Sequence, residues 1–326
     1  MESITVASDG APVRLDVFLA RHIPQCSRRT AQRAVAEGII RVNGRRARKG
    51  HMLRGGDVVQ VADDLLAPAA LQPNSELAIP VLYEDAAVIA LDKPAGMPSH
   101  ALRGREQLTV ANFLLARYPE LEGVGKTPLE PGIVHRLDTE TSGILLVART
   151  AAAYDALRRQ FATHRVTKEY LALVHGDVVA AGEVRAPIAH DPRSHRRMRV
   201  CAGSGSRAAR PAVTFYSPLE HLTGATLLSV RIPTGVMHQI RVHLASIGHP
   251  IVGDRLYGRG VAGISAPRHM LHAHQLTFAH PLTGASTRIS CDAPRDFSAC
   301  RDALRPRIRA RLGRARNRPG AETPRG

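Results

Sequence analysis

The segment from residue 132 to residue 149 constrains the fold of this 326-residue chain more than any other. It reads GIVHRLDTETSGILLVAR, with apolar residues near both ends and polar residues between them. Short apolar runs bounded by polar residues are typical of buried strands, so we expect one strand to enter a polar turn and a second to leave it. Asp138 lies in that turn, two residues after Arg136. The segment therefore predicts a single carboxylate where two strands end, a position that can face a cleft.

Further short β-like runs recur along the chain after residue 79, and helical stretches lie between them without regular alternation. Regular alternation is what a doubly wound parallel sheet requires. We therefore predict an α+β fold with a mixed, largely antiparallel β-sheet for a large domain at residues 79–300. The expected strands include residues 88–91, 144–147, 170–174, 227–230 and 240–244, and the expected helices include residues 110–117 and 151–161.

A small α/β module is expected at residues 1–62. An apolar-periodic helix begins at Val13, and Ser27 is a good N-cap for a second helix, which Gly38 ends. The second helix directs three cations toward solvent, where they could contact a polyanion: Arg28, Arg29 and Arg33. The remaining elements of the module are strands and tight turns, at residues 39–42, 43–44, 55–57 and 58–61.

The net charge of +17 is concentrated at the two ends of the chain. Residues 13–61 carry eleven Arg or Lys and three acidic residues, and residues 301–326 carry nine Arg and two acidic residues. Clustered cations favour a polyanion, because each neutralised phosphate releases condensed counterions. A generic basic surface could by itself account for the tail. We interpret residues 63–78 as a linker and residues 301–326 as a largely disordered, Arg-rich tail.

Several classes of site and location are disfavoured by composition. The four cysteines are scattered without metal-binding spacing, and no apolar run is long enough to span a bilayer, so reduced thiols in a cytoplasmic protein are the simplest account. His272 and His274 alternate as on one strand face but lack carboxylate or thiol neighbours in the sequence. We therefore predict no metal site. Aromatic residues make up 4% of the chain, which argues against a broad base-stacking surface.

Four segments of the large domain together resemble the RluA-type pseudouridine synthases, which isomerise uridine in RNA. The N-terminal module is similar to the αL-type RNA-binding domain of a ribosomal small-subunit protein, on the residues 14–16, 27–28, 37–38, 42–44 and 56–57. The four matching segments of the large domain are residues 83–96, the Asp138 segment, residues 168–176 and residues 234–254.

The resemblance implies an isomerase that needs no cofactor, because the reaction gains and loses no atoms. Asp138 would be the nucleophile, as ionised carboxylates are in glycosidases. Arg241 would pair with Asp138, and Tyr170 would pack on the target ring as a candidate for removing the proton from carbon 5. Arg136 would either fill the gap left by the flipped base or clamp a phosphate. We assign further substrate contacts to His135, Lys93, His238 and Gln239, although Lys93 also fits a structural turn.

Alternatives to these roles remain open at this point. Asp138 could be a turn residue that binds backbone amides, and Arg241 could be a surface cation of a strand. Val236 and Met237 stand where the family commonly has Arg and Thr, which removes a cation and a hydroxyl near the cleft.

The expected partner of the module, the tail and the large domain is RNA. The resemblance favours large-subunit ribosomal RNA, because family members with this N-terminal module often act there, with transfer RNA as an alternative, and a monomer is the default state. A catalytically silent RNA-binding protein and a glycosylase that uses Asp138 and water are the competing functions.

Overall fold

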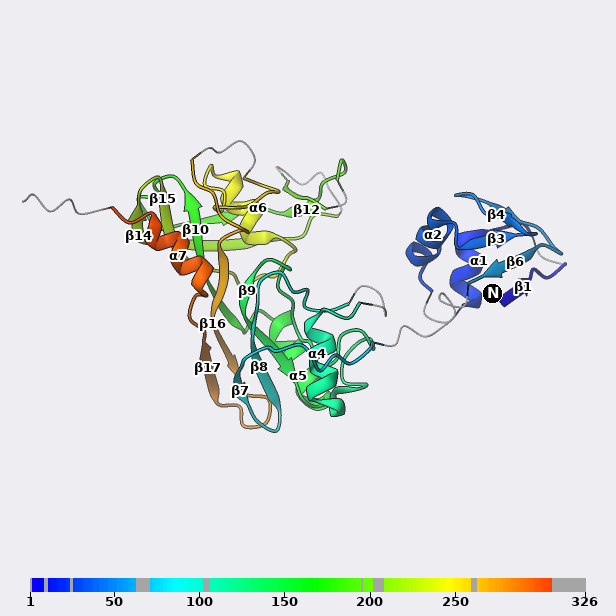
Figure 1. Cartoon of the computed structure of the whole chain (residues 1–326), viewed down its shortest axis with the longest axis horizontal. Coiled ribbons are helices and arrows are strands. Elements are labelled where there is room, and N and C mark those ends of the chain that lie inside the picture. The colour runs from blue at the N-terminus through cyan, green and yellow to red at the C-terminus, as the bar shows by residue number, and fades with distance from the viewer. Residues whose placement is uncertain are drawn as a thin grey trace, which may run out of the picture.

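The computed structural model describes residues 2–8, 11–23, 26–62, 71–101, 106–194, 196–201, 208–258 and 263–306. Figure 1 shows an N-terminal domain with its own small sheet and a larger domain built on a long sheet. The buried apolar residues fall into separate clusters, one within the N-terminal domain and three within the larger domain. Each domain therefore has a hydrophobic core of its own.

Two helices and a four-stranded sheet form the N-terminal domain. Helix α1 spans Leu15–His22 and helix α2 spans Arg28–Glu37, and the sheet order is β1-β6-β3-β4. The predicted start of the first helix was two residues early, because Val13 and Arg14 pair with the segment Met52–Leu53 as strands β2 and β5. The other strands are β1 Glu2–Thr5, β3 Ile40–Val42, β4 Arg45–Arg46 and β6 Val58–Val61.

Local signals define helix α2 as predicted. The Ser27 side chain accepts a hydrogen bond from the backbone N–H of Thr30, and Gly38 ends the helix with a φ of 76°. The three predicted cations of this helix are exposed, although two of them have acidic neighbours. Arg28 lies 3.3 Å from Asp16, Arg33 lies 3.8 Å from Glu37, and Arg29 is exposed beside them.

The large domain is built on a nine-stranded sheet with the order β11-β14-β15-β10-β16-β9-β8-β7, in which β17 also pairs with β16. Only β16 and β9 run parallel among the described strand pairs of this sheet. This confirms the prediction of an α+β fold with a mixed, largely antiparallel sheet. The strands are β7 Val81–Glu84, β8 Val88–Lys93, β9 Ser142–Ala148, β10 Thr167–His175, β11 Gly182–Arg185, β14 Val213–Leu222, β15 Ala225–Arg231, β16 Leu271–Ala279 and β17 Ser286–Ser290.

Helices cover both faces of the sheet near β8 and β9. Side chains alternate between the two faces of a strand, and Leu145 packs in the cluster that includes Leu114 of α4, whereas Leu146 packs in the cluster that includes Leu157 of α5. Because both faces are covered, every residue of β9 is buried. The remaining elements are α4 Val110–Arg117, the short 3₁₀ helix Pro119–Leu121, α5 Ala151–Ala162, α6 Gln239–Ser246, α7 Arg295–Ala303, and the separate hairpin β12 Ile188–His190 with β13 Met198–Val200.

Two predicted strands are absent, and both corrections affect the site. Residues 240–244 form part of helix α6. Their alternation imitated a strand because Arg241 and His243 are buried and partnered instead of facing solvent. Residues 134–141 form a loop, and Ile133 makes only an isolated bridge to β9. The catalytic candidate Asp138 therefore precedes one strand and does not lie between two.

The predicted linker and tail lie partly outside the described residues, namely at residues 63–70 and 307–326. Leu71 is buried in the main core of the large domain, and Asn112 of α4 donates a hydrogen bond of 2.7 Å to the carbonyl of Gln72. Helix α7 continues to Ala303, and Arg305 pairs with Glu220 at 2.7 Å. The first residues of the predicted tail are therefore part of the folded domain.

Candidate active site

The loop that carries Asp138 is fixed by side chains from distant segments. Ser99 donates to the carbonyl of Leu137 at 3.0 Å and accepts from its N–H at 3.1 Å. On the other side of Asp138, the Arg268 guanidinium donates to the carbonyl of Glu140 at 3.0 Å. Since backbone groups in a buried loop need such partners, these contacts give the loop one defined conformation and hold Asp138 in place.

Lys93 supports the same loop from the protein interior and does not line the cavity that opens beside the loop. Its side chain is fully buried, and Nζ donates to the carbonyls of Pro94, Met97 and Thr139 at 2.7–3.0 Å. These three acceptors match the three donors of an ammonium group. The prediction that Lys93 contacts substrate is therefore wrong, because burial and saturated hydrogen bonding leave it a structural role at the base of the Asp138 loop.

A cavity of about 660 Å³ opens beside this loop, within the size range of sites that hold small organic ligands. Its described lining contains one carboxylate, that of Asp138. The lining is otherwise apolar or basic apart from Thr141, Tyr170 and Gln239, and its basic residues are His135, Arg136, Arg158, His164, Lys168, Arg210, His238 and Arg241. A single acid among cations suits a negatively charged substrate and a reaction that depends on one carboxylate.

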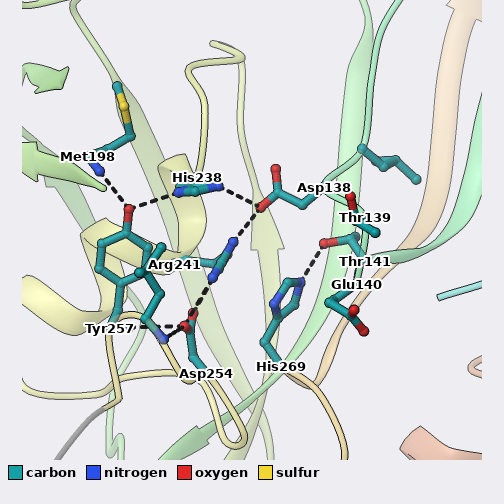
Figure 2. A network of polar contacts seen from close by, with 12 residues as sticks. Asp138, Thr139, Glu140, Thr141, Met198, His238, Arg241, Asp254, Tyr257 and His269 are labelled. Atoms are coloured by element: carbon teal, nitrogen blue, oxygen red, sulfur yellow. Dashed lines mark hydrogen bonds and ion pairs between the residues drawn. The ribbon is translucent and has the colours of Figure 1, made fainter. Parts of the chain in front are cut away.

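Helix α6 directs Arg241 between two carboxylates, as Figure 2 shows. Its Nη1 donates to Asp138 at 2.8 Å, and its Nε and Nη2 donate to the two oxygens of Asp254 at 2.7 and 3.0 Å. The side chain of Asp254 is fully buried, whereas that of Asp138 is 19% exposed. Arg241 is thus held rigidly by Asp254 and presents its remaining nitrogen to Asp138.

The electrostatic environment keeps Asp138 ionised. Burial by itself would raise the pKa of the Asp138 carboxyl. The positive charges of His238, when it is protonated, and of Arg241, together with the hydrogen bond from Arg241, lower that pKa more strongly, so the net shift is downward. Asp138 is therefore a carboxylate at neutral pH, as a nucleophile must be.

His238 immediately precedes helix α6, and its ring faces Asp138. Its Nε2 lies 3.8 Å from Asp138 Oδ2, and its Nδ1 lies 2.9 Å from the hydroxyl of Tyr257. Its φ of 57° is uncommon for a residue with a side chain. Burial lowers the pKa of His238 below its ordinary value, so its ring is neutral near pH 7.

Tyr170 of strand β10 lines the cavity and is 8% exposed. Burial and the negative charge of Asp138 both raise the pKa of its phenol. Within the described part of the chain, no hydrogen-bond partner is found for the hydroxyl. Tyr170 is therefore a protonated phenol that faces the cavity, with its ring packed in the main core.

Two other predicted substrate contacts, His135 and Gln239, make polar contacts within the protein. His135 lines the cavity, but its Nε2 accepts from the N–H of Leu146 at 2.9 Å, and its ring stacks on Phe161. Burial is the largest cause that lowers the pKa of His135 to about 3, so the ring stays neutral. Gln239 also lines the cavity, but its side-chain amide is satisfied by four polar groups of the protein, so its contact with substrate stays a prediction. Those groups are the Thr234 hydroxyl, the Val236 N–H, the Val213 carbonyl and the Thr214 hydroxyl.

Arg136 differs from His135 and Gln239 in that its polar group makes no such contacts within the described part of the chain. It is exposed, it lines the cavity, and no ion pair or hydrogen bond to the described residues engages its guanidinium. A cation in this state is available to a phosphate or a base.

Val236 and Met237, which differ from the residues common in the family, contribute to the packing near the site. Val236 is buried with Met198 of the β12–β13 hairpin and Val242 of α6, and Met237 packs against the same cluster. Apolar packing beneath the hairpin thus replaces the cation and hydroxyl that the family commonly has there.

Sequence reasoning missed the roles of Asp254, Tyr257 and His269. The Gly-Asp pair at residues 253–254 was part of a matching segment, but nothing in the sequence links that carboxylate to Arg241. His269 contacts the Thr141 hydroxyl at 2.8 Å, and burial is the largest cause that lowers its pKa to about 3. It therefore stays neutral and helps to hold the end of the Asp138 loop.

The described residues contain no group of three or more His, Cys, Asp or Glu side chains that could hold a metal ion. His272 and His274 lie on strand β16, and both contact the carbonyl of Cys291. The four cysteines are free. None of the helices described here is long and apolar enough to cross a membrane.

Comparison with known proteins agrees with this geometry. Residues 87–246 match the family described as RNA pseudouridylate synthase, and residues 13–59 match the S4 domain. Ribosomal large subunit pseudouridine synthase D of Xanthomonas campestris is 38% identical over 317 residues, which cover 94% of this chain and 93% of the relative. The protein of the same name from Nitrosomonas europaea is 37% identical over 309 residues, with 93% and 87% covered.

A solved structure, human RNA pseudouridylate synthase domain containing 4, is 27% identical with a TM-score of 0.57, and it covers 69% of this chain and 92% of its own. The resemblance seen in the sequence is confirmed. The chain belongs to the RNA pseudouridylate synthase family, with an N-terminal S4 domain, and is an isomerase that converts uridine to pseudouridine in RNA.

Proposed function

We propose that this enzyme isomerises specific uridines of large-subunit ribosomal RNA, with Asp138 as the nucleophile. The substrate class is supported by relatives from several bacteria that are named ribosomal large subunit pseudouridine synthase D and match almost the whole chain. The role of Asp138 rests on one observation, that among the described residues it is the one carboxylate lining a cationic cavity and is held there by Arg241.

The reaction needs a temporary covalent partner. The bond between the ring nitrogen and the sugar breaks, the base turns, and carbon 5 bonds to the sugar instead. Carbon 5 loses a proton and the ring nitrogen gains one, so no atom is gained or lost overall. Attack by the Asp138 carboxylate on the base or the sugar holds the two halves together during the turn. Arg241 helps to keep that carboxylate charged and orients it.

Tyr170 is assigned a contact with the uracil ring and not the role of a base. A phenol with a raised pKa keeps its proton at neutral pH, so it can donate a hydrogen bond but cannot accept the carbon 5 proton. Its fixed place in the core gives the turning base a flat apolar surface.

Arg136 and the S4 domain are assigned to the RNA. A base in a helix leaves its stack at a cost of roughly a few kcal/mol, and the unpaired guanidinium of Arg136 is free to occupy the vacated space. On α2, the exposed Arg28, Arg29 and Arg33 would contact the RNA backbone. Arg29 has no charged partner in the described part of the chain.

We further propose that the enzyme acts as a monomer. A ribosomal RNA substrate implies action in the cytoplasm.

Release of tritium from carbon 5 of labelled uridine tests the function directly. Transcripts of large-subunit ribosomal RNA and of transfer RNA serve as parallel substrates, and pseudouridine mapping locates the modified position. We expect release from the ribosomal transcript only. Activity confined to transfer RNA would refute the substrate class, release of free uracil would indicate a glycosylase, and no turnover on either RNA would indicate a silent binding protein.

Replacing Asp138 with asparagine tests the nucleophile. We expect Asp138→Asn to lose turnover and keep RNA binding, because only a charge and a reactive oxygen are removed. Asp155→Asn, the same change at an exposed carboxylate of α5, is the matched control and should leave turnover unchanged. Turnover by Asp138→Asn at the wild-type rate would exclude this residue as the nucleophile.

A further inference from the structure

One turn, residues 254–257, organises both side chains that face Asp138. The carboxylate of Asp254 holds Arg241 and also accepts hydrogen bonds from the backbone N–H groups of Leu256 and Tyr257, at 2.9 and 3.0 Å. The Tyr257 hydroxyl at the end of the same turn reaches His238. A single short segment thus sets the positions of a cation and an imidazole on either side of the nucleophile.

One hydrogen bond to the Tyr257 hydroxyl has a fixed direction. The backbone N–H of Met198 donates to this oxygen at 2.8 Å. Nδ1 of His238, at 2.9 Å, is the other polar atom found within hydrogen-bonding distance of it among the described residues. Because Nδ1 is the acceptor within reach and the hydroxyl still has its own proton to donate, we assign the phenol proton to Nδ1. Figure 2 shows this series of contacts from Met198 to Asp138.

We propose that Tyr257 is a positioning residue that fixes His238 in the neutral tautomer with its proton on Nε2, directed at the Asp138 carboxylate. This rests on the proposed role of Asp138. In a neutral imidazole one ring nitrogen donates and the other accepts. Occupying Nδ1 with a donated proton leaves Nε2 as the donor, and Nε2 is the nitrogen nearer to Asp138.

This arrangement places one cation in contact with Asp138 and one neutral N–H group 3.8 Å from its carboxylate. Arg241 supplies a permanent positive charge that favours the ionised carboxylate. A second fixed cation at His238 would hold the carboxylate oxygens more tightly and make them poorer nucleophiles. The hydrogen bond from Tyr257 opposes that outcome, because protonating Nδ1 would place a donor where the phenol already donates.

The structure holds Tyr257 and His238 in place from two directions. Tyr257 packs in the apolar cluster formed with Val236, Met198 and Val242, and the hairpin that carries Met198 supplies the N–H. His238 has a left-handed backbone conformation, which an L-residue adopts only when its surroundings favour it. The contact with Tyr257 is one such constraint.

Tyr257→Phe tests the proposal, because it removes one hydroxyl and keeps the ring. Tyr154→Phe on α5 is the matched control, since Tyr154 lies outside the cavity lining and its hydroxyl has no hydrogen bond to the described residues. We expect the single-turnover rate of Tyr257→Phe to fall about fivefold to tenfold, with RNA affinity unchanged, as expected for the loss of one orienting hydrogen bond. Tyr154→Phe should retain the wild-type rate.

The tautomer is measured independently of activity. In protein labelled with ¹⁵N-histidine, the ring nitrogen shifts of His238 report which nitrogen carries the proton, and the signals are assigned by their loss in His238→Gln. We expect protonated Nε2 in the wild type and a mixture of tautomers in Tyr257→Phe. A wild-type ring protonated on Nδ1, or an unchanged tautomer in Tyr257→Phe, would overturn the proposal.

A double-mutant cycle separates positioning from general loss of stability. If Tyr257 acts through His238, then Tyr257→Phe should have no further effect on the single-turnover rate in a His238→Ala background. Additive effects would overturn the proposal. If the wild type makes no pseudouridine at all, the proposed function fails, whereas the ¹⁵N measurement still decides the tautomer.

Discussion

Replacing Asp254 with asparagine tests whether Arg241 must be held in position by Asp254 or whether the positive charge of Arg241 is sufficient by itself. The change preserves the size of the side chain and removes its charge. In the folded protein Asp254 accepts two hydrogen bonds from Arg241 and two from backbone N–H groups, and its side chain has no exposed surface. An amide cannot accept on both atoms, so at least one of these contacts becomes a repulsive donor–donor pair.

The expected loss of stability follows from the burial of the pair. Removing one partner of a buried ion pair costs about 3–5 kcal/mol, because the other charge is left without compensation. Arg241 would keep its ion pair with Asp138, which is partly exposed. We therefore place the loss of stability in Asp254→Asn at the lower end of this range, about 3 kcal/mol. For a domain of this size, that loss corresponds to a decrease in Tm of about 6–12 °C.

The pH dependence of this loss has a defined sign. Burial would raise the pKa of Asp254, but the hydrogen bonds and charge of Arg241 lower it below its ordinary value. A carboxyl with a lowered pKa in the folded state contributes stability that is present above the pKa of the unfolded chain, about 4, and lost as pH falls through the folded pKa. The stability difference between wild type and Asp254→Asn should therefore be constant above about pH 5 and shrink below about pH 4.

Denaturant unfolding at several pH values, with single-turnover kinetics beside it, measures both consequences. Turnover should fall at least about tenfold, since Arg241 is no longer held in place against Asp138. Asp155→Asn serves again as the exposed control and should change neither quantity. An Asp254→Asn protein as stable and as active as the wild type would refute the view that the pair holds Arg241 in position.

Two further predictions concern the rest of the chain. Deleting residues 1–62 should weaken RNA binding and leave the isomerisation rate unchanged. If α2 contacts three phosphates, the deletion should make the slope of log affinity against log salt concentration less steep by about 2–3 units, which binding assays at several salt concentrations would measure. Equal affinity of the two proteins at every salt concentration would contradict this role. Gly253 and Gly248 both have positive φ, but a Cβ at Gly253 would overlap the carbonyl oxygen of Arg268, whereas nothing lies near Gly248. Gly253→Ala should therefore lose at least about 2 kcal/mol more than Gly248→Ala in thermal or denaturant unfolding, and equal losses would show that the backbone relaxes.

Elements defined by nearby residues could be predicted from the sequence. The N-cap at Ser27 acts on a backbone N–H three residues away, and the turn at Asn43 joins two strands that are adjacent in sequence. In both cases the residues that determine the conformation are within a few positions of each other, so no knowledge of the tertiary structure is needed.

Helix α6 could not be predicted in the same way. A surface helix shows a polar stripe every 3.6 residues, but the residues from Gln239 to Leu244 are all buried. Polar side chains at Arg241 and His243 are buried because acceptors from other segments meet them. With no solvent-facing stripe, the pattern matched the period of two that a strand shows, and only the tertiary partners decide in favour of a helix.

The candidate site also contains features that the sequence indicated and features that only the structure shows. The identity of Asp138 and Arg241 came from segments that resemble a family, although the two residues are 103 positions apart. The sequence did not indicate which polar groups are already satisfied by the protein. Lys93 and Gln239 were assigned to the substrate because of their residue type and position, and the structure shows that each has its hydrogen-bonding capacity used within the fold.

Burial separates two tasks that cations perform around Asp138. A cation that fixes the charge and orientation of the proposed nucleophile must not move when RNA arrives, and Arg241 meets this condition because Asp254 holds two of its nitrogens in the interior. A cation that binds RNA must instead be free to exchange water for phosphate or base, and Arg136 meets that condition at the exposed edge of the same cavity. If one residue served both tasks, RNA binding would compete with Asp138 for the same guanidinium. Two arginines on different elements avoid this competition, so a bound RNA can change the surroundings of Arg136 while the pair of Asp138 and Arg241 stays intact.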